Sequence, residues 1–319
     1  MTSSLATRVG GLQLINPVIC GSGEPVMTEA GIRAALRAGA AGVIAKSVNE
    51  RPEAAAQLDI ADYAWEGESL LCRSGLIQRP VADWFAALAG LDREAARHGQ
   101  FVAASVVMAG EDGAADIASH AAHAGLRVFE LNVGAPHAAE ARKGAIVAEA
   151  EPAQLRAIVA RVRAAVPGMQ LWVKLTGLSS NLPALAEAAR TGGADAVVMM
   201  GRFMAMLPDI DRFVPVLGTS GAYGGGWALP IVCRFLAISR KTVGPAFPLL
   251  GEIKPQKNKD KPRASGSPFA TWWWQFAKEQ ARLLASGAAG NGLPDHFQEP
   301  PKPRAWPWEP SAQGRHVQR

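Results

Sequence analysis

Two lysines in this sequence stand at the ends of apolar, β-prone runs. Lys46 lies in the run 42–47 and Lys174 in the run 171–176, although the first 251 residues hold only four lysines in all. Burying an ammonium group without a partner is costly, so a lysine in such a run indicates a specific role. In parallel α/β proteins, sites form at the carboxyl ends of the strands. This pattern favours a barrel enzyme that holds an anionic, ring-shaped cofactor.

The elements that must position these lysines alternate between apolar runs and helical patterns, which is typical of repeated βα units. The expected strands are 17–21, 42–47, 101–107, 127–133, 170–176, 194–200 and 247–251. The expected helices include 28–37, 114–124, 152–166, 182–190 and 228–240. The fold class is therefore α/β, with right-handed crossovers between parallel strands. Two forms stay open: a closed (β/α)8 TIM barrel, or one incomplete at its last βα unit, because no eighth strand is identifiable after residue 251.

Composition excludes several classes of protein. The chain has 319 residues, 49% of them hydrophobic, which suits one large barrel with a sizeable core. No apolar stretch approaches the ~20 residues of a membrane span, and the first residues lack the layout of a secretory signal. The three cysteines are widely spaced, which gives neither a metal cluster nor a disulfide framework. We expect a reduced cytoplasmic protein without a metal or a membrane segment.

The C-terminal residues 252–319 differ in kind from the body, 1–251. They carry 11 Lys+Arg and 6 Asp+Glu, which accounts for the whole net charge of +5 and leaves a neutral body without a footprint for nucleic acid. Nine of 22 prolines and five of nine tryptophans also lie there, and such proline density opposes helix and central strand. The expected domains are a barrel, 1–251, and a basic, Pro/Trp-rich extension, 252–319, that is poorly ordered or read out of frame. A basic–aromatic segment for nucleic acid or a membrane surface is the alternative.

Small and polar residues follow several of the expected strands. Gly21 and Ser22 follow the first strand, Lys46 and Ser47 end the second, and Asn132 ends the fourth. After the sixth strand, a glycine-rich stretch leads into a helix, and glycines allow the close backbone approach that a phosphate needs. Taken alone, this stretch is equally consistent with a plain flexible connection.

Taken in order, these segments resemble the dihydroorotate dehydrogenase family of FMN-binding barrels, related to the pyrimidine-reducing domain of dihydropyrimidine dehydrogenase. The resemblance starts at Val9-Gly10-Gly11-Leu12, with Asn16-Pro17-Val18 closing an N-terminal hairpin, and ends at 248–251, which is about four-fifths of the chain. It implies a TIM-barrel flavoprotein with FMN as cofactor and a place in pyrimidine biosynthesis.

The resemblance implies a role for each matching residue. Gly21 and Ser22 would lie against the flavin ring, and Lys46 and Ser47 would meet it from the second strand. Lys174 would stabilise the negative charge of the reduced flavin, as a fixed cation does. The phosphate end of FMN would lie against glycines of later strands and loops: Gly221, Gly224, Gly225 and Gly251.

The chain departs from the family in the loop after the fourth strand. Ala135 stands where the family has a cysteine base, and alanine cannot transfer a proton. His137 in the same loop is the natural substitute, since histidine titrates near neutral pH, and a solvent-exposed loop histidine is the alternative. Asn132 would bind polar groups of flavin or substrate. The candidate catalytic residues are therefore His137, Lys46 and Asn132.

A second departure follows Gly251, where the resemblance implies a phosphate-binding turn. Glu252 would repel a phosphate, and Pro255 lacks an amide donor. Two functions stay open: an FMN-dependent oxidoreductase acting on CH–CH bonds, converting dihydroorotate to orotate or acting on a related substrate, and a non-catalytic or cofactor-deficient barrel remnant. A different phosphate-binding barrel, such as an isomerase, ranks last, because it would need a carboxylate pair and only Glu24 and Glu130 lie near strand ends.

The expected partners are a small-molecule substrate and other protein chains, without nucleic acid or membrane. The sequence holds no dinucleotide fingerprint and no iron–sulfur cysteine cluster, so NAD chemistry would need an electron-transfer partner subunit. A homodimer is implied by family analogy alone.

Overall fold

The structure, a computed structural model, describes most of the expected barrel. The described residues are 5–49, 63–66, 69–73, 76–108, 110–133, 151–175, 177–201 and 203–252. His137 and its loop lie outside them, as does the C-terminal extension beyond Glu252. The expected division at residue 251 therefore stays a prediction.

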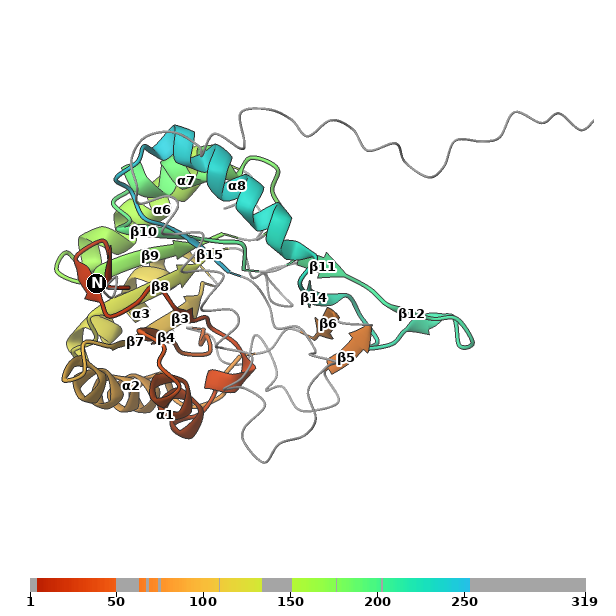
Figure 1. The fold of residues 1–319 in the computed structure, drawn as a ribbon, viewed down its shortest axis with the longest axis horizontal. Coiled ribbons are helices and arrows are strands. Elements are labelled where there is room, and N and C mark those ends of the chain that lie inside the picture. Colours follow the sequence, from red (N-terminus) through yellow and green to blue (C-terminus); the bar gives the residue numbers. More distant parts are fainter. Residues whose placement is uncertain are drawn as a thin grey trace, which may run out of the picture. The chain divides into compact units, whose positions relative to one another are not determined.

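Seven parallel strands form the central sheet (Figure 1). Their order is β15-β10-β9-β8-β7-β4-β3, and every neighbouring pair is parallel. The bounds are β3 Ile19–Cys20, β4 Gly42–Ile44, β7 Phe101–Val107, β8 Val128–Asn132, β9 Gln170–Lys174, β10 Ala196–Met199 and β15 Leu249–Gly251. All seven expected strands are confirmed, although several are shorter than expected. Within the described residues no eighth strand joins β15 to β3, so the sheet is a curled, incomplete barrel.

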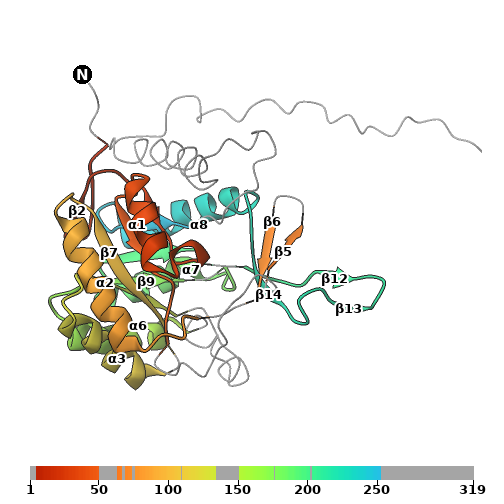
Figure 2. The ribbon, with the colours of Figure 1, turned by 90° about the horizontal axis from the view of Figure 1, so that it is seen from below.

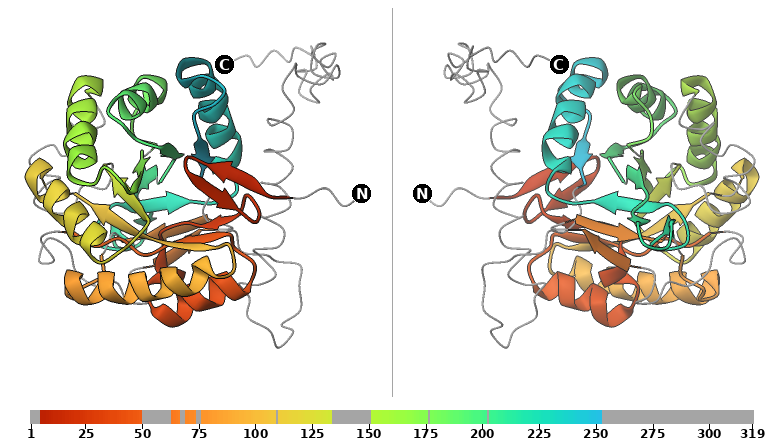
Figure 3. Two further views of the ribbon diagram at one scale, coloured as in Figure 1. Left: turned by 90° about the vertical axis from the view of Figure 1, so that its left-hand side faces the viewer. Right: turned by 90° about the vertical axis from the view of Figure 1, so that its right-hand side faces the viewer.

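Helices cover the outer face of this curled sheet (Figure 3). They are α1 Glu29–Arg37, α2 Val81–Ala96, α3 Glu111–His123, α6 Pro152–Ala165, α7 Leu182–Thr191 and α8 Ala228–Val243. Their boundaries follow local rules: the hydroxyl of Thr28 caps α1 by accepting from the amide of Gly31, and Pro152 occupies the first turn of α6. Five of the six were expected, and α2 was not.

Strand alternation gives the sheet two different faces. The outward residues, such as Val102, Leu131 and Val173, form the large core beneath the helices. The inward residues nearer the amino ends form a second apolar cluster, in which Phe101 and Trp172 meet edge to face at 5.4 Å between ring centroids. Parallel strands buried on both faces read as continuous apolar runs, which explains why the sequence reveals them.

An N-terminal hairpin closes the amino end of this interior. Strands β1, Thr7–Val9, and β2, Leu12–Leu14, are antiparallel, and Val9 and Leu14 join the inner cluster. Gly10 has a φ of +55°, and a Cβ there would lie 2.3 Å from the side chain of Gln170. The turn therefore requires glycine at this position. The hairpin agrees with the one that the family resemblance implies.

A second, antiparallel sheet was not expected from the sequence. It has the order β11-β14-β6-β5, and Figure 2 shows it beside the hairpin β12–β13. The bounds are β5 Tyr63–Glu66, β6 Ser69–Cys72, β11 Phe203–Ala205, β12 Pro208–Asp209, β13 Val214–Pro215 and β14 Gly221–Gly224. The prediction of a glycine-rich loop after the sixth strand is therefore wrong in part, because residues 221–224 form a strand that pairs with both β6 and β11.

Candidate functional site

Polar side chains gather at the carboxyl end of the seven-stranded sheet. They come from or directly follow six of the seven strands, and they continue inward beyond the apolar cluster near the amino ends. The set is Ser22, Lys46, Ser47, Ser105, Glu130, Lys174 and Glu252. This is the end at which parallel barrels build their sites.

Lys174 lies at the centre of this set, at the end of β9. Its side chain is only 3% exposed. Its Nζ lies 2.5 Å from Oε2 of Glu252 and 3.7 Å from Oε1 of Glu130. Burial lowers the pKa of Lys174, but the negative charges of Glu130, Glu252 and Glu24 outweigh it, so the net shift of the pKa is upward. Lys174 therefore remains a cation, held by two counter-charges.

Hydrogen bonds and one ion pair link Lys174, on β9, to the β3 edge of the sheet. The hydroxyls of Ser22 and Ser47 are 3.1 Å apart, and those of Ser47 and Ser105 are 2.9 Å apart. Ser105 donates to Oε1 of Glu130 at 2.7 Å, and Glu130 is the distant carboxylate of Lys174. The network thus runs without a break from the end of β3 to the end of β9. A change in charge at Lys174 can therefore alter the strength of the hydrogen bonds between the hydroxyls of this network.

Lys46 pairs with a different carboxylate, that of Glu24. Its Nζ lies 2.8 Å from Oε1 of Glu24, in the short 3-10 helix Glu24–Val26, and its side chain is 12% exposed. The thiol of Cys72 approaches the same carboxylate at 3.7 Å. The structure therefore places both predicted lysines at the same end of the sheet, each with a carboxylate partner.

Glu252 closes the set from the other edge of the sheet. It directly follows β15, and its amide donates to the carbonyl oxygen of Met199. A Cβ added to Gly21, after β3, would lie 3.6 Å from the Cδ of Glu252. Burial, together with the negative charge of Glu252, raises the pKa of the neighbouring Cys20 thiol to about 12. This carboxylate therefore lies among the residues expected to hold a ring-shaped cofactor.

Two of the glycines predicted to hold a phosphate, Gly221 and Gly225, are required by the packing of this fold. A Cβ at Gly221 would lie 2.5 Å from the carbonyl oxygen of Cys72, and one at Gly225 would lie 2.8 Å from the hydroxyl of Ser69. Close pairing of β14 with β6 therefore requires small residues there. Gly224 ends β14, and Gly251 ends β15. Their phosphate contacts stay a prediction.

The remaining predicted residues divide between described and undescribed parts of the chain. Asn132 ends β8 and pairs in register with Lys174 on β9 and Val107 on β7. It therefore lies at the carboxyl end of the sheet, as the network does. His137 lies outside the described residues. Sequence reasoning missed Ser105, and the available signal was a lone serine within an otherwise apolar strand.

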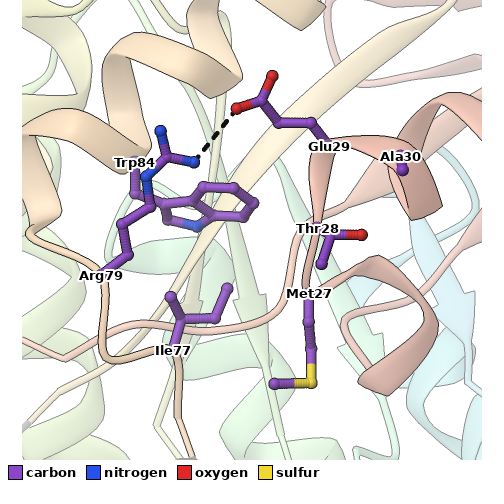
Figure 4. A pocket seen from close by; sticks show the side chains of 7 residues that line it. All are labelled: Met27, Thr28, Glu29, Ala30, Ile77, Arg79 and Trp84. Atoms are coloured by element: carbon purple, nitrogen blue, oxygen red, sulfur yellow. Dashed lines mark hydrogen bonds and ion pairs between the residues drawn. The ribbon is translucent and has the colours of Figure 1, made fainter.

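A cavity of about 440 Å³ lies elsewhere, beside the start of α1 (Figure 4). In it, Arg79 pairs with Glu29 at 3.2 Å and lies over the ring of Trp84 at 5.4 Å. Its other lining residues are Met27, Thr28, Ala30 and Ile77, and none of the seven belongs to the polar network. The charges in this cavity satisfy each other, so the network remains the candidate site.

Two negative findings concern the described residues alone. Among them, no group of three or more His, Cys, Asp or Glu side chains could hold a metal ion. None of the helices in the described part of the chain is long and apolar enough to cross a membrane.

A curled parallel sheet with its polar groups gathered at the carboxyl end defines the TIM-barrel class. The chain is 31% identical over 232 residues to the dihydroorotate dehydrogenase B (NAD(+)) catalytic subunit of Methanocella arvoryzae, covering 72% of this chain and 73% of that protein. It is also 31% identical over 240 residues to the subunit of the same name from Methanosarcina mazei, covering 73% and 72%. The chain belongs to the dihydroorotate dehydrogenase family, whose members are oxidoreductases.

A solved structure supports the fold, and the family models do not contribute. Dihydroorotate dehydrogenase (DHODH) of Eimeria tenella in complex with ferulenol matches with a TM-score of 0.62, at 13% identity, over 78% of this chain and 72% of that one. No family model matches the chain.

Proposed function

We propose that this chain is an FMN-dependent oxidoreductase of the dihydroorotate dehydrogenase type, which acts on the CH–CH bond of dihydroorotate or a related substrate. The observation that carries the proposal is Lys174, a cation with a 3% exposed side chain at the carboxyl end of the barrel. A buried fixed cation is suited to stabilise negative charge that develops in a reaction. Family membership supplies the reaction class.

Most of the residues at the site fit a flavin. Ser22 and Ser47 offer hydroxyls that donate and accept, Lys174 offers a cation, and Gly21 leaves space beside them. FMN would supply a two-electron acceptor at this position. Glu252 does not fit, because its carboxylate lies next to both Lys174 and Gly21.

The chain's own residues would bind the substrate and move the proton. We propose that Asn132, on the same edge as Lys174, binds polar groups of the flavin or substrate, and that Lys46 contacts the flavin from the second strand. His137, in place of the family's cysteine, would accept the proton from the substrate carbon, since Ala135 cannot. The serine chain from Ser22 to Ser105 would orient the polar groups around the ring.

A second subunit belongs to the proposal. The relatives from Methanocella and Methanosarcina are named as catalytic subunits of an NAD(+)-dependent enzyme. We propose that this chain likewise passes electrons to a partner subunit and forms a homodimer. A cytoplasmic location also stays a prediction.

One observation favours a second candidate function. A carboxylate among the proposed flavin ligands is what a cofactor-deficient barrel remnant would tolerate, because such a barrel has no anionic ring to accommodate. The same observation is compatible with the enzyme if the carboxylate leaves when the cofactor binds.

An absorbance spectrum of the purified full chain, before and after addition of FMN, separates the two. Flavin absorbance that co-elutes with the protein, and that is bleached anaerobically by dihydroorotate, is the result expected of the enzyme. A protein that takes up no FMN would favour the remnant.

A further inference from the structure

Among the described residues, the carboxylates in contact with the buried Lys174 outnumber its single positive charge. Lys174 brings one positive charge, and Glu130 and Glu252 bring two negative charges within 3.7 Å and 2.5 Å of its Nζ. Glu130 already receives the hydroxyl of Ser105 at 2.7 Å and lies within the serine chain. Glu252 is thus the extra carboxylate, and it makes the shorter contact.

Glu252 reaches Lys174 because of its place in the sheet. Gly251 pairs with Met199 across β15 and β10, and the amide of Glu252 extends the same ladder by one bond. Leu250 packs against the inner cluster, and side chains two residues apart on an extended segment point to the same side. The side chain of Glu252 is therefore directed into the interior, where it is only 15% exposed.

The carboxylate also uses the space that a glycine leaves open. A Cβ at Gly21 would lie in van der Waals contact with Glu252, at 3.6 Å from its Cδ and Oε1. A ring that lay against Gly21 and next to Lys174 would need this volume. It would also bring electron-rich atoms against a carboxylate in a site of low dielectric, where like charges repel strongly.

We infer that Glu252 is an internal counter-ion, which occupies the anion-binding position of Lys174 and must leave before a small anion or the ring of FMN can bind there. The part that concerns FMN rests on the proposed function. Removal of Glu252 should leave Glu130 as the carboxylate in contact with Lys174 and free the position beside Gly21.

Two variants of the full chain test this inference through binding. In Glu252→Gly the side chain is removed, and FMN, followed by quenching of its fluorescence, should bind roughly tenfold tighter than to the unmodified chain, or better, which corresponds to about 1.4 kcal/mol. Glu252→Gln keeps the shape and loses the charge, so its gain should be smaller. Glu187→Gln, which breaks an exposed pair with Arg190 on α7, removes the same charge elsewhere and should change nothing.

A second readout does not depend on FMN. Acetate is a small carboxylate that can take the place of the missing one, so it should raise the Tm of Glu252→Gly and leave the unmodified chain unaffected. Potassium chloride at the same ionic strength controls for salt, and Glu252→Gln serves if Glu252→Gly does not fold, with a smaller acetate effect expected.

The outcomes separate the inference from the proposed function. Acetate stabilisation without FMN binding by any variant would support the internal counter-ion and overturn the proposed use of FMN. An unmodified chain that binds FMN as tightly as Glu252→Gly would overturn the inference and support the flavoenzyme. Variants that gain neither FMN affinity nor acetate stabilisation would also overturn the inference.

Discussion

The two ends of the sheet's interior are built by the same strands, yet their chemistry is opposite. On β9, Trp172 belongs to the apolar cluster near the amino ends, and Lys174, two residues later on the same side, binds Glu130 and Glu252. On β7, Phe101 belongs to that cluster and Ser105 to the hydrogen-bonded chain. Two to four residues along a strand therefore separate a layer that stabilises the barrel from a layer that can perform chemistry.

This division tells where substitutions should affect stability and where they should affect binding. The amino-end layer is stabilised by close packing and buried apolar area, so the stability lost on substitution should depend on the side-chain volume removed. The carboxyl-end layer is stabilised by charge pairing, so the stability lost on substitution should depend on which charged side chain is left without its counter-charge. Substitutions in each layer can break or sharpen this distinction.

The largest loss is expected for Trp172→Ala. Trp172 is fully buried against Phe101, and removing a buried tryptophan typically costs about 3–5 kcal/mol. Urea unfolding followed by circular dichroism measures the free energy of unfolding. Trp227→Ala, at a residue that is 37% exposed, is the matched control and should cost much less. Equal losses at the two positions would show that the amino-end layer is not a tightly packed core.

Lys174→Met should cost about 3 kcal/mol, for a different reason. The methionine fills the volume, but the buried Glu130 and the largely buried Glu252 remain without their cation, and breaking a buried ion pair from one side is expensive. Lys46→Met removes a lysine from its more exposed pair with Glu24, so its loss of stability should be nearer ~1 kcal/mol.

The decisive comparison for this layer is the double variant Lys174→Met with Glu130→Gln. If charge pairing holds the layer together, the double variant should be more stable than Lys174→Met alone, because it also removes one of the two carboxylates that lost their cation. Additive losses in the urea series would place the role of Lys174 in packing instead.

Ser105→Ala should have an intermediate effect, between about 1.5 and 3 kcal/mol. It removes the donor that reaches Glu130 at 2.7 Å, and hydrogen bonds to charged groups contribute about this much. Ser119→Ala on α3, whose hydroxyl bonds a carbonyl oxygen within its own helix, is the control and should be close to neutral. If Ser105→Ala leaves the free energy of unfolding unchanged, the hydrogen bond from Ser105 to Glu130 does not couple the serine chain to the ion pairs.

The contrast between the layers also explains what the sequence could reveal. The seven strands were predictable because parallel strands buried on both faces read as apolar runs, and Phe101–Val107 is buried throughout. The four strands of the second sheet were not, since each has only three or four residues and β6 pairs with β14 from a distant part of the chain. Short strands with remote partners leave no local periodicity.

The candidate site was predictable only where a residue was rare in its context. Lys46 and Lys174 stand out because lysines are few in the body of the chain. A serine within an apolar strand is unremarkable in sequence, so Ser105 was missed. Glu252 was interpreted only as a group that repels phosphate, and its contact with Lys174 depends on how β15 lies beside β10, which no local pattern encodes.

An effect that is absent near neutral pH and appears only in alkaline solution links the two edges of the sheet. Burial, with Glu252 nearby, raises the pKa of the Cys20 thiol to about 12 in the folded chain, whereas an unfolded thiol titrates near ~8.5. The unfolded chain therefore releases this proton first. The contribution of Cys20 to stability is fully present below pH ~8.5 and is lost, by at most about 1.4 kcal/mol per pH unit, as the pH rises toward 12.

Urea unfolding at pH 8, 9 and 10 measures this contribution as the difference between the unmodified chain and Cys20→Ala. Taking the difference cancels the contributions of other groups that titrate in the same range. As the pH rises, the unmodified chain should lose stability relative to Cys20→Ala. Cys233→Ala, at a half-exposed thiol on α8, is the control with a shallower slope. In the background of Glu252→Gln the slope of Cys20 should also decrease, because one cause of its raised pKa is gone. A slope that is unchanged by Glu252→Gln would mean that the carboxylate does not lie near the end of β3 in solution, and would separate the two edges of the sheet that Glu252 joins here.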